Sequence, residues 1–377
     1  MKIIYLTGEF APFQGGIGTY VREMAEAAAS QGHDVTVAAP NYGSSVHVED
    51  DSYPFRVLRY AGGEYSARQI PAKWYHTGRL AHAEKFDVVH AVDWSFYLPL
   101  ALSAFRWRSR CILTFHGSEI SGMSRISRRL VLRLVGFWSG WALMIANSRF
   151  TADRIRSKFP SQPTEKIRFV PLGVSARPFA VISREDARVS LGIEQNEFVV
   201  LSLGRVVPRK GHHITLEAIS SLSDRKRMSY LWYIVGAAGD PAYLSRITSS
   251  LAGSGVRSVR TGSVSADRLE LIFAAADVLC VPGVWGYHGE VEGFGLVYLE
   301  AGLREIPSIG ANIGGTADAV VDGETGILIE PGDSVALAAA LERLRVDVDF
   351  REQLSGRALE YAKSHTWTRV VEKTYDE

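Results

Sequence analysis

The chain has 377 residues, of which 46% are hydrophobic and 22% are charged, and its formal net charge at pH 7 is +1. This composition indicates a soluble globular protein and argues against a chain dominated by disorder, and the length favours two domains. The two cysteines, Cys111 and Cys280, lie in apolar runs, so we expect buried, reduced thiols and a cytoplasmic protein. The first apolar run is too short for a signal peptide, and the longest uncharged stretch, residues 134–146, is shorter than the about 20 residues that a membrane-spanning helix needs.

The amino-terminal half alternates apolar strands with helical patterns. After the first strand, residues 19–32 form a helical pattern in which Val21, Met24, Ala25 and Ala28 share one face. Alternation of this kind predicts a parallel sheet covered by helices. The predicted strands of this half are residues 2–7, 34–40, 87–92, 111–117 and 142–148.

A glycine cluster, Gly15-Gly16-Ile17-Gly18, follows the first strand. Because doubly wound folds bind ligands at the carboxyl ends of strands, this loop is expected at the mouth of a site. It does not fit a dinucleotide fingerprint, since Val21 stands where the third glycine would be and no acid ends the second strand. Nor is it a P-loop, since no Gly-Lys-Ser/Thr follows. A tight turn without a ligand is the alternative.

His116 lies at the end of the fourth predicted strand and precedes a glycine, so it too is expected at the carboxyl end of a strand. A lone histidine is usually structural, and from the residues alone that interpretation stands beside a functional one.

The segment 102–158 is strongly basic, with eleven Lys or Arg and two acids, a charge of 11 − 2 = +9. Such a segment indicates a polyanionic partner. Within it, Arg125–Trp141 interleaves arginines with leucine, phenylalanine and tryptophan, as an interfacial helix would. The alternative is an ordinary helix packed on its own domain. Nucleic acid is disfavoured, because no RNA- or DNA-binding motif accompanies the charge.

The carboxyl-terminal half repeats the alternation, with helical stretches such as 213–222 and 267–276 between the strands. Residues 170–186 lose the periodicity and contain two prolines, which suits a linker. The predicted fold class is α/β, with two doubly wound domains. The predicted strands are residues 198–206, 231–236, 277–283, 307–311 and 326–330.

Arg205 and Lys210 lie in the loop after the strand that begins at residue 198. Two cations at this place suit a diphosphate, because arginine offers a planar fork and lysine a mobile point charge. Solvated surface residues are the alternative.

Residues 289–302, GEVEGFGLVYLEAG, hold Glu292 and Glu300 with seven residues between them. If a helix starts near Gly295, its free N–H groups form a ready phosphate site. The two carboxylates are then up to about 12 Å apart along the axis, too far to share one proton, but suited to hold two ends of one long polar ligand. Helix capping is the alternative.

These elements resemble those of retaining glycosyltransferases with the GT-B fold, in particular glycosyltransferase family 4, also called glycosyl transferases group 1. The resemblance lies in the Glu-x7-Glu segment, in His116-Gly117 and in Gly204–Gly211, and it covers essentially the whole chain in order. It implies two Rossmann-like domains that face a central cleft. Residues 1–170 would bind the acceptor and residues 171–356 the nucleotide sugar, and a helix at 357–377 would pack back on the first domain.

The resemblance also implies roles for residues. Catalytic roles fall to His116 beside the transferred sugar, to Glu292 on its hydroxyls and to Arg205 and Lys210 on the leaving diphosphate. Donor-binding roles fall to Gly15, Gly16, Arg205, Lys210, Val264, Phe294, Gly295, Leu296 and Glu300. Glu300 would hold the ribose, and the backbone near Val264 the nucleobase.

Two departures from the family pattern stand out. After the second glutamate the family commonly has Ala-x-Ala-x-Gly-x-Pro, whereas residues 301–307 read AGLREIP and lack the glycine before Pro307. The usual acid of the Gly-Gly-x-x-Glu turn is the shorter Asp318.

The predicted activity is transfer, with retention, of glucose or mannose from a UDP- or GDP-sugar to a saccharide or a lipid-linked acceptor, in polysaccharide or glycolipid biosynthesis. No cofactor or metal is expected: Asp347 and Asp349 follow a helical stretch, and His212 and His213 are predicted loop residues without ligand partners. A cytoplasmic location is expected, with peripheral contact to the inner face of the membrane through Arg125–Trp141. The alternatives are a non-catalytic sugar-nucleotide-binding protein and an inverting, epimerase-like GT-B enzyme.

Overall fold

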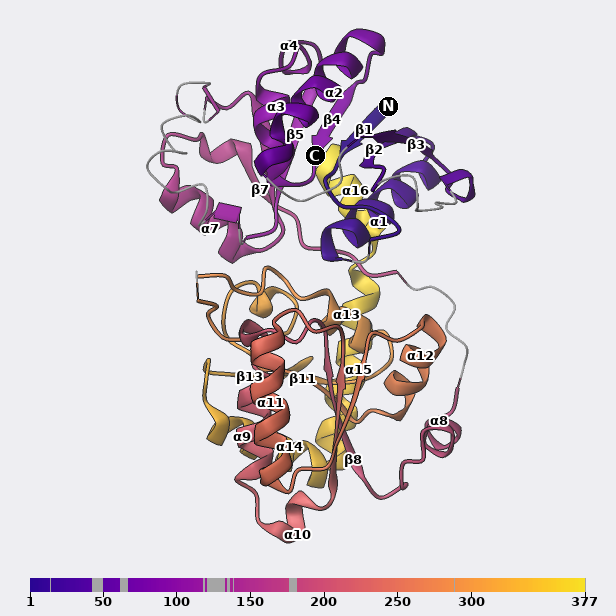
Figure 1. Ribbon diagram of the computed structural model, residues 1–377, viewed down its shortest axis with the longest axis vertical. Helices are drawn as coiled ribbons and strands as arrows, with labels where there is room; N and C mark the ends of the chain where they lie inside the picture. The colour runs from indigo at the N-terminus through magenta and orange to yellow at the C-terminus, as the bar shows by residue number, and fades with distance from the viewer. Residues whose placement is uncertain are drawn as a thin grey trace. The chain divides into compact units, whose positions relative to one another are not determined.

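The computed structural model divides into two compact units (Figure 1). Unit 1 comprises Met1–Gly173 and Trp367–Glu377, and unit 2 comprises Val174–Thr366. The residues that the structure describes are 1–13, 15–42, 50–61, 67–117, 119–120, 133, 136–137, 139–175, 182–287 and 289–376.

In the described part of unit 1, seven parallel strands form one sheet in the order β3-β2-β1-β4-β5-β6-β7. The central strands are buried on both faces, which explains why they are continuous apolar runs. All five strands predicted for this half are present. The sequence missed β3 and β7, which lie at the two edges and are only partly buried. The strands are β1 (Lys2–Leu6), β2 (Asp34–Pro40), β3 (Arg56–Tyr60), β4 (Val88–Ala91), β5 (Arg110–Phe115), β6 (Ala142–Ala146) and β7 (Ile167–Phe169).

Helices cover this sheet. The predicted apolar face of the first helix is confirmed, because Val21, Met24, Ala25 and Ala28 are all buried. Cys111 on β5 is buried and free, as predicted. The helices described in unit 1 include α1 (Gly16–Ser30), α2 (Ile70–Ala83), α3 (Tyr97–Ala101), α4 (Phe105–Arg108), α7 (Arg149–Lys158) and α16 (Trp367–Tyr375).

The last helix, α16, lies beside α1 (Figure 1) and enters a buried chain of hydrogen bonds. His90 Nδ1 lies 2.9 Å from the Tyr375 hydroxyl, which in turn donates to the Tyr5 hydroxyl over 2.7 Å. On its other side, His90 Nε2 lies 2.6 Å from Thr114 Oγ1, which lies 3.2 Å from the Tyr20 hydroxyl. Burial, with a smaller contribution from a neighbouring histidine, lowers the pKa of His90 to about 3, so this ring is neutral at pH 7. One ring nitrogen therefore donates and the other accepts.

Replacing Tyr375 by phenylalanine is expected to lower the free energy of unfolding by about 1–3 kcal/mol, because His90 Nδ1 would lose its buried partner. Urea denaturation measures the difference. The matched control is Tyr75→Phe on α2, where the ring is 62% exposed. An equal, small effect of both substitutions would contradict the role of the network.

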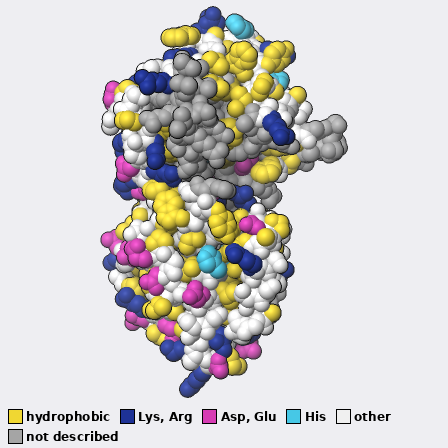
Figure 2. Space-filling view, turned by 60° about the vertical axis from the view of Figure 1, so that its left-hand side comes forward, with side chains coloured by type: hydrophobic (Ala, Val, Ile, Leu, Met, Phe, Trp, Pro, Cys, Tyr) yellow, Lys and Arg dark blue, Asp and Glu magenta, His cyan; other side chains and the backbone are white. Residues whose placement is uncertain are grey.

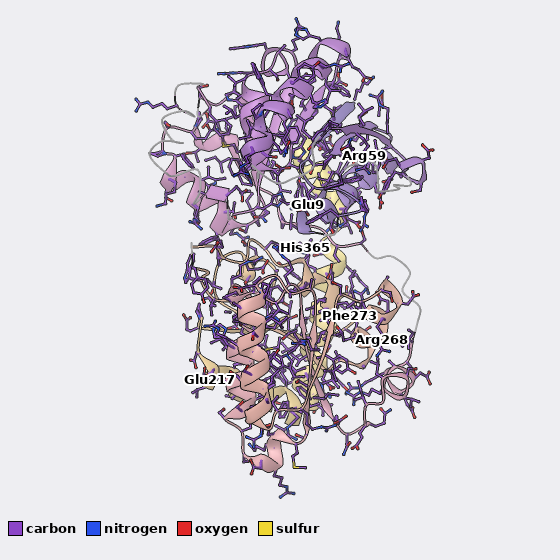
Figure 3. All side chains as sticks on the ribbon, viewed as in Figure 1. Glu9, Arg59, Glu217, Arg268, Phe273 and His365 are labelled. Atoms are coloured by element: carbon purple, nitrogen blue, oxygen red, sulfur yellow. The ribbon has the colours of Figure 1, made fainter. Side chains whose placement is uncertain are left out.

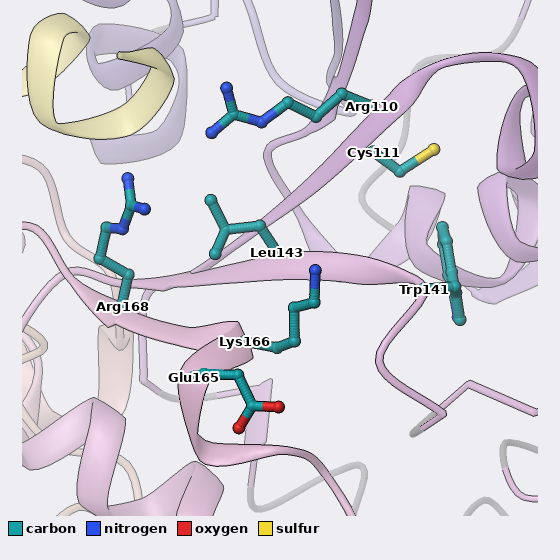
Figure 4. Close-up of a pocket in the computed structure, with 7 residues that line it drawn as sticks. All are labelled: Arg110, Cys111, Trp141, Leu143, Glu165, Lys166 and Arg168. Atoms are coloured by element: carbon teal, nitrogen blue, oxygen red, sulfur yellow. The ribbon is translucent and has the colours of Figure 1, made fainter. Parts of the chain in front are cut away.

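Two arginines hold the carboxyl-terminal end of α16. Arg110 donates to the carbonyl of Tyr375, and Arg168 Nη1 donates to the carbonyl of Lys373 over 2.7 Å. Cations at this end also complement the helix dipole. Beside them a pocket of about 210 Å³ opens at the amino ends of β5, β6 and β7, away from the strand ends where the glycine cluster and His116 lie (Figure 4). Its lining residues are Arg110, Cys111, Trp141, Leu143, Glu165, Lys166 and Arg168.

Over the residues described in unit 2, six parallel strands form a sheet in the order β10-β9-β8-β11-β12-β13. The five predicted strands are present, and the missed strand, β10, is again a partly buried edge strand. Cys280 on β11 is buried and free. On the face of unit 2 that Figure 2 shows, acidic and basic side chains are interspersed. The strands are β8 (Phe198–Leu203), β9 (Tyr230–Val235), β10 (Ser258–Gly262), β11 (Val278–Val281), β12 (Ser308–Ala311) and β13 (Gly326–Ile329).

Three details of unit 2 differ from the sequence analysis. His212 and His213 begin helix α9 and are not loop residues. The predicted helix at 357–377 is two helices, because α15 ends at Ser364 in unit 2 and α16 begins at Trp367 in unit 1. Glu305, at the place where the family pattern has glycine, takes the left-handed conformation with φ 55°, which is uncommon for a residue with a side chain. The helices described in unit 2 include α8 (Arg184–Leu191), α9 (His212–Ser220), α10 (Asp224–Arg227), α11 (Pro241–Ser254), α12 (Ala266–Ala275), α13 (Leu296–Gly302), α14 (Ser334–Val346) and α15 (Val348–Ser364).

Candidate functional site

The candidate site in unit 2 lies at the carboxyl ends of β8 and β11. From β8 the chain proceeds to β9 and β10 on one side of the sheet and then crosses to β11 on the other side. In an open parallel sheet this is the topological switch point, where the connections diverge and leave a crevice for a ligand. Lys210 lies in the loop after β8 and Glu292 in the loop after β11.

Lys210 and Glu292 form an ion pair in this crevice. Lys210 Nζ lies 2.5 Å from Glu292 Oε2, and Arg209 Nη1 lies 3.3 Å from the same oxygen. The side chains of Lys210, Glu292 and Arg209 are 10%, 16% and 24% exposed, so all three are partly shielded and within reach of a ligand. Burial alone would raise the pKa of Glu292, but Lys210 and Arg209 outweigh it and hold this pKa below its usual range. Glu292 is therefore an anion at pH 7.

The two loops are held together through their backbones. Gly211 has φ 75°, and a Cβ atom there would lie 1.8 Å from the carbonyl oxygen of Pro282. Only glycine permits this approach. Next to it, the amide of Val284 donates to the carbonyl of Arg209 over 3.0 Å. The positions of Arg209 and Lys210 are thus tied to the loop after β11.

A glycine turn after β12 fixes the backbone of Glu292. The amide of Gly315 donates to the carbonyl of Glu292 over 2.9 Å, and a Cβ atom on Gly314, where φ is 62°, would lie 2.2 Å from that carbonyl oxygen. Three successive loops of the sheet therefore position one carboxylate.

Helix α13 begins at Leu296, with Gly295 as its left-handed N-cap residue, close to the predicted start. Phe294 is buried, so it would offer a ligand its backbone and not its ring. Glu300 lies inside α13 and is partly exposed. Tyr298 fastens the helix to the sheet, because its hydroxyl donates to the carbonyl of Val281 over 2.8 Å.

Two predicted donor-site residues lie apart from the Lys210–Glu292 pair. Arg205 follows β8 directly, is exposed, and makes no hydrogen bond or ion pair with another described residue. Val264 lies in the loop after the edge strand β10, before α12. Both are at the carboxyl edge of the sheet, as the prediction required, but neither contacts Glu292 in the part of the chain that the structure describes.

In unit 1 the predicted residues also lie at a carboxyl edge. His116 follows β5, and its Nε2 lies 2.9 Å from the carbonyl oxygen of Val92. Its ring packs nearly perpendicular to the Tyr20 ring, with the two ring centroids 5.2 Å apart. Gly15 and Gly16 lie in the loop after β1, at the start of α1. The same loop contains Glu9 (Figure 3), a residue that the sequence analysis did not select.

Glu9 contacts two glycines of this loop. Its carboxylate accepts a hydrogen bond from the amide of Gly18 over 3.0 Å. A Cβ atom on Gly15 would lie 2.1 Å from Glu9 Oε1, so a side chain at that position would displace the carboxylate. The loop therefore presents a negative charge among its amides.

Arg209 is a second site residue that was not predicted. The signal was available, because Arg209 and Lys210 are neighbours in the Pro-Arg-Lys-Gly turn. The spacing of the family pattern, however, selected Arg205 and Lys210, and only the fold shows which arginine meets Glu292.

Other predictions are limited by the described residues. Most of Arg125–Trp141 lies outside them. Within the described ranges we find no group of three or more His, Cys, Asp or Glu residues that could hold a metal ion, and Asp347 caps α15 by accepting from the amide of Phe350. No helix in these ranges is long and apolar enough to cross a membrane.

Two family models match the chain in succession. The model described as Glycosyltransferase Family 4 matches residues 14–177, and the model described as Glycosyl transferases group 1 matches residues 183–361. The two matches follow the division into unit 1 and unit 2.

Curated relatives match over nearly their full length. A GDP-mannose-dependent alpha-(1-6)-phosphatidylinositol monomannoside mannosyltransferase of Mycobacterium tuberculosis is 27% identical, with 100% of this chain and 97% of the relative covered. A D-inositol 3-phosphate glycosyltransferase of Corynebacterium diphtheriae is also 27% identical, with 99% and 93% covered.

Solved structures share the fold. HepE of Anabaena, in complex with UDP and glucose, has a TM-score of 0.80 at 19% identity, covering 100% of this chain and 98% of that one. A sucrose-phosphate synthase of Thermosynechococcus elongatus has a TM-score of 0.80 at 20% identity, with 98% and 96% covered. The predicted GT-B fold class is confirmed.

Proposed function

We propose a donor and an acceptor for this chain, which belongs to the group 1 glycosyl transferases of glycosyltransferase family 4 and is thus a nucleotide-sugar-dependent hexosyltransferase of a retaining family. In this proposal it transfers glucose or mannose from a UDP- or GDP-sugar to a saccharide or lipid-linked acceptor. The observation that carries this proposal is the Lys210–Glu292 pair, with Arg209, at the switch point of unit 2. Cations there suit a diphosphate and a carboxylate suits sugar hydroxyls. The relatives named for GDP-mannose, and HepE with UDP and glucose, support these donor classes.

In the proposed donor site the diphosphate lies along Lys210 and Arg205. Glu292 accepts hydrogen bonds from the sugar hydroxyls and Glu300 from the ribose. The backbone amides from Phe294 to Leu296 face the phosphates, and the backbone near Val264 holds the base. Lys210 already lies in the crevice. The Arg205 side chain is exposed and has no hydrogen-bond or ion-pair partner among the described residues, so it is available to contact the diphosphate.

The proposed reaction breaks the bond between the anomeric carbon and the diphosphate oxygen and forms a bond from that carbon to the acceptor oxygen on the same face. The leaving phosphate takes the proton of the acceptor hydroxyl. Lys210 and Arg205 stabilise the charge that builds on the leaving group, and Glu292 stabilises the positive charge on the sugar. His116 would supply a polar contact beside the transferred sugar.

For the acceptor we propose unit 1, at the carboxyl edge that carries His116, Gly15 and Gly16. Glu9 in the same loop suits hydroxyl groups, because a carboxylate accepts their hydrogen bonds. A lipid-linked acceptor at the inner face of the membrane would agree with the basic composition of residues 102–158 and with the lipid named for the mycobacterial relative.

A thermal-shift panel tests the donor. UDP, GDP, ADP and their glucose and mannose conjugates are added at one common concentration, and a ligand present at about 100 times its dissociation constant stabilises by about 2.7 kcal/mol. We expect the cognate nucleotide to raise the Tm by about 5 °C, with and without EDTA, and Lys210→Ala to abolish the rise. NMR of the product should show a retained anomeric configuration. An inverted product would indicate the epimerase-like branch, and binding without turnover a non-catalytic protein.

A further inference from the structure

The carboxylate of Glu292 is held by two cations on one oxygen. Lys210 Nζ and Arg209 Nη1 both contact Oε2, at 2.5 and 3.3 Å. Both of these contacts are to Oε2, so Oε1 is the oxygen left for a ligand hydroxyl. One cation is enough to neutralise one carboxylate. The charge of Glu292 therefore does not by itself explain why both Lys210 and Arg209 contact it.

The two cations differ in what they can do next. Lys210 has a flexible stem and a compact charge. Its side chain runs across Gly204 at the end of β8, where a Cβ atom would lie 3.4 Å from Lys210 Cε. The ammonium group of Lys210 therefore lies at the end of β8, where we place the diphosphate of the donor. Arg209 has a planar guanidinium with several donors in a fixed fork, which suits holding a carboxylate in one place.

A diphosphate in the crevice changes the competition for Lys210. Before the donor binds, Glu292 is its partner. A diphosphate carries two negative charges and attracts the lysine more strongly than one carboxylate does. If Lys210 were the sole partner of Glu292, the move would leave a largely buried carboxylate without a cation, which is costly.

We propose that Arg209 is a positioning residue for Glu292, which holds the carboxylate in place and ionised when Lys210 turns to the donor diphosphate. Arg209 then acts on the sugar end of the donor and not on the phosphate end. This inference rests on the proposed function.

The test compares Arg209→Met, Arg209→Lys and Arg205→Met. Arg209→Met is expected to lower kcat about tenfold, since it removes one charged hydrogen bond to Glu292. The affinity for UDP or GDP, whichever gives the larger thermal shift, should stay within about twofold of the wild-type value. Because Arg209 opposes the effect of burial, its loss raises the pKa of Glu292. Activity requires the ionised form, so the acid limb of the pH profile of kcat, which reports the donor-bound enzyme, should move to higher pH. Arg209→Lys should return the acid limb of the pH profile part of the way to its wild-type position.

If the inference holds, Arg205→Met gives the opposite pattern. The affinity for UDP or GDP falls, and the acid limb of the pH profile stays at its wild-type position. Arg225→Met on α10 loses the same charge from an exposed helix and is the control for general electrostatic effects. The inference is overturned if Arg209→Met weakens UDP or GDP binding about tenfold with an unmoved acid limb, since Arg209 would then be a phosphate ligand.

A different result would show that the proposed function is wrong: the wild-type protein would turn over no nucleotide sugar. In that event the pKa of Glu292 is read by carbon NMR of labelled glutamate side chains in the wild type and in Arg209→Met. A pKa that rises in the variant with UDP or GDP bound supports the positioning role, and an unchanged pKa contradicts it.

Discussion

Replacing Glu292 by glutamine is expected to lower kcat at least about 100-fold, the size of effect seen when one electrostatic contact to a transition state is lost. Glutamine keeps the shape and can still accept hydrogen bonds, but it has no charge to offer the positively charged sugar. It also releases Lys210 and Arg209 from their shared partner. Steady-state kinetics with the nucleotide sugar identified by thermal shift measure the loss.

The fold should survive this substitution, because the Glu292 side chain is partly exposed and its backbone is held by Gly314 and Gly315. The matched control is Glu217→Gln on α9 (Figure 3), an exposed carboxylate of the same unit. A folded Glu292→Gln enzyme with the turnover of the control would refute the site assignment.

The second large effect concerns stability. Replacing Arg188 by methionine is expected to lower the free energy of unfolding by about 3–5 kcal/mol. Arg188 on α8 is fully buried; its Nη2 donates to Asp277 Oδ2 over 2.7 Å and its Nη1 to the carbonyl of Gln195 over 2.8 Å. Methionine would leave Asp277, which is also buried, and several carbonyls without this donor. Urea denaturation measures the loss.

Arg184→Met is the control, because Arg184 contacts the other oxygen of Asp277 with a side chain that is 46% exposed. We expect it to cost about 1 kcal/mol or less. Equal losses in the two variants would mean that burial is not what makes the Arg188 contact important. Since this network lies at the amino ends of β8 and β11, kcat of the surviving folded enzyme should stay unchanged in both.

The sequence was informative about strands wherever burial is complete. Strands β1 and β8 lie inside their sheets, so both faces select apolar residues and the runs are unbroken. The edge strands β3, β7 and β10 have half-exposed patterns with charged residues, and no periodicity separates them from loops. The fourth edge strand, β13, was predicted, because its Gly-Ile-Leu-Ile run carries no charged residue.

By itself, the sequence determined the alternation that makes two doubly wound units. It also placed Lys210 in a loop after a strand, His116 at the carboxyl end of a strand and Glu292 just before a helix. These are local properties of apolar runs and the turns that end them. Only the tertiary structure decided which of these residues meet. Lys210 and Glu292 are 82 residues apart in the chain and come together because β8 and β11 are neighbours in the sheet and because Gly211 lets the two loops touch. The same contact chose Arg209 over Arg205 as a partner of Glu292, since reach across a crevice depends on where a backbone is anchored and not on spacing along the chain.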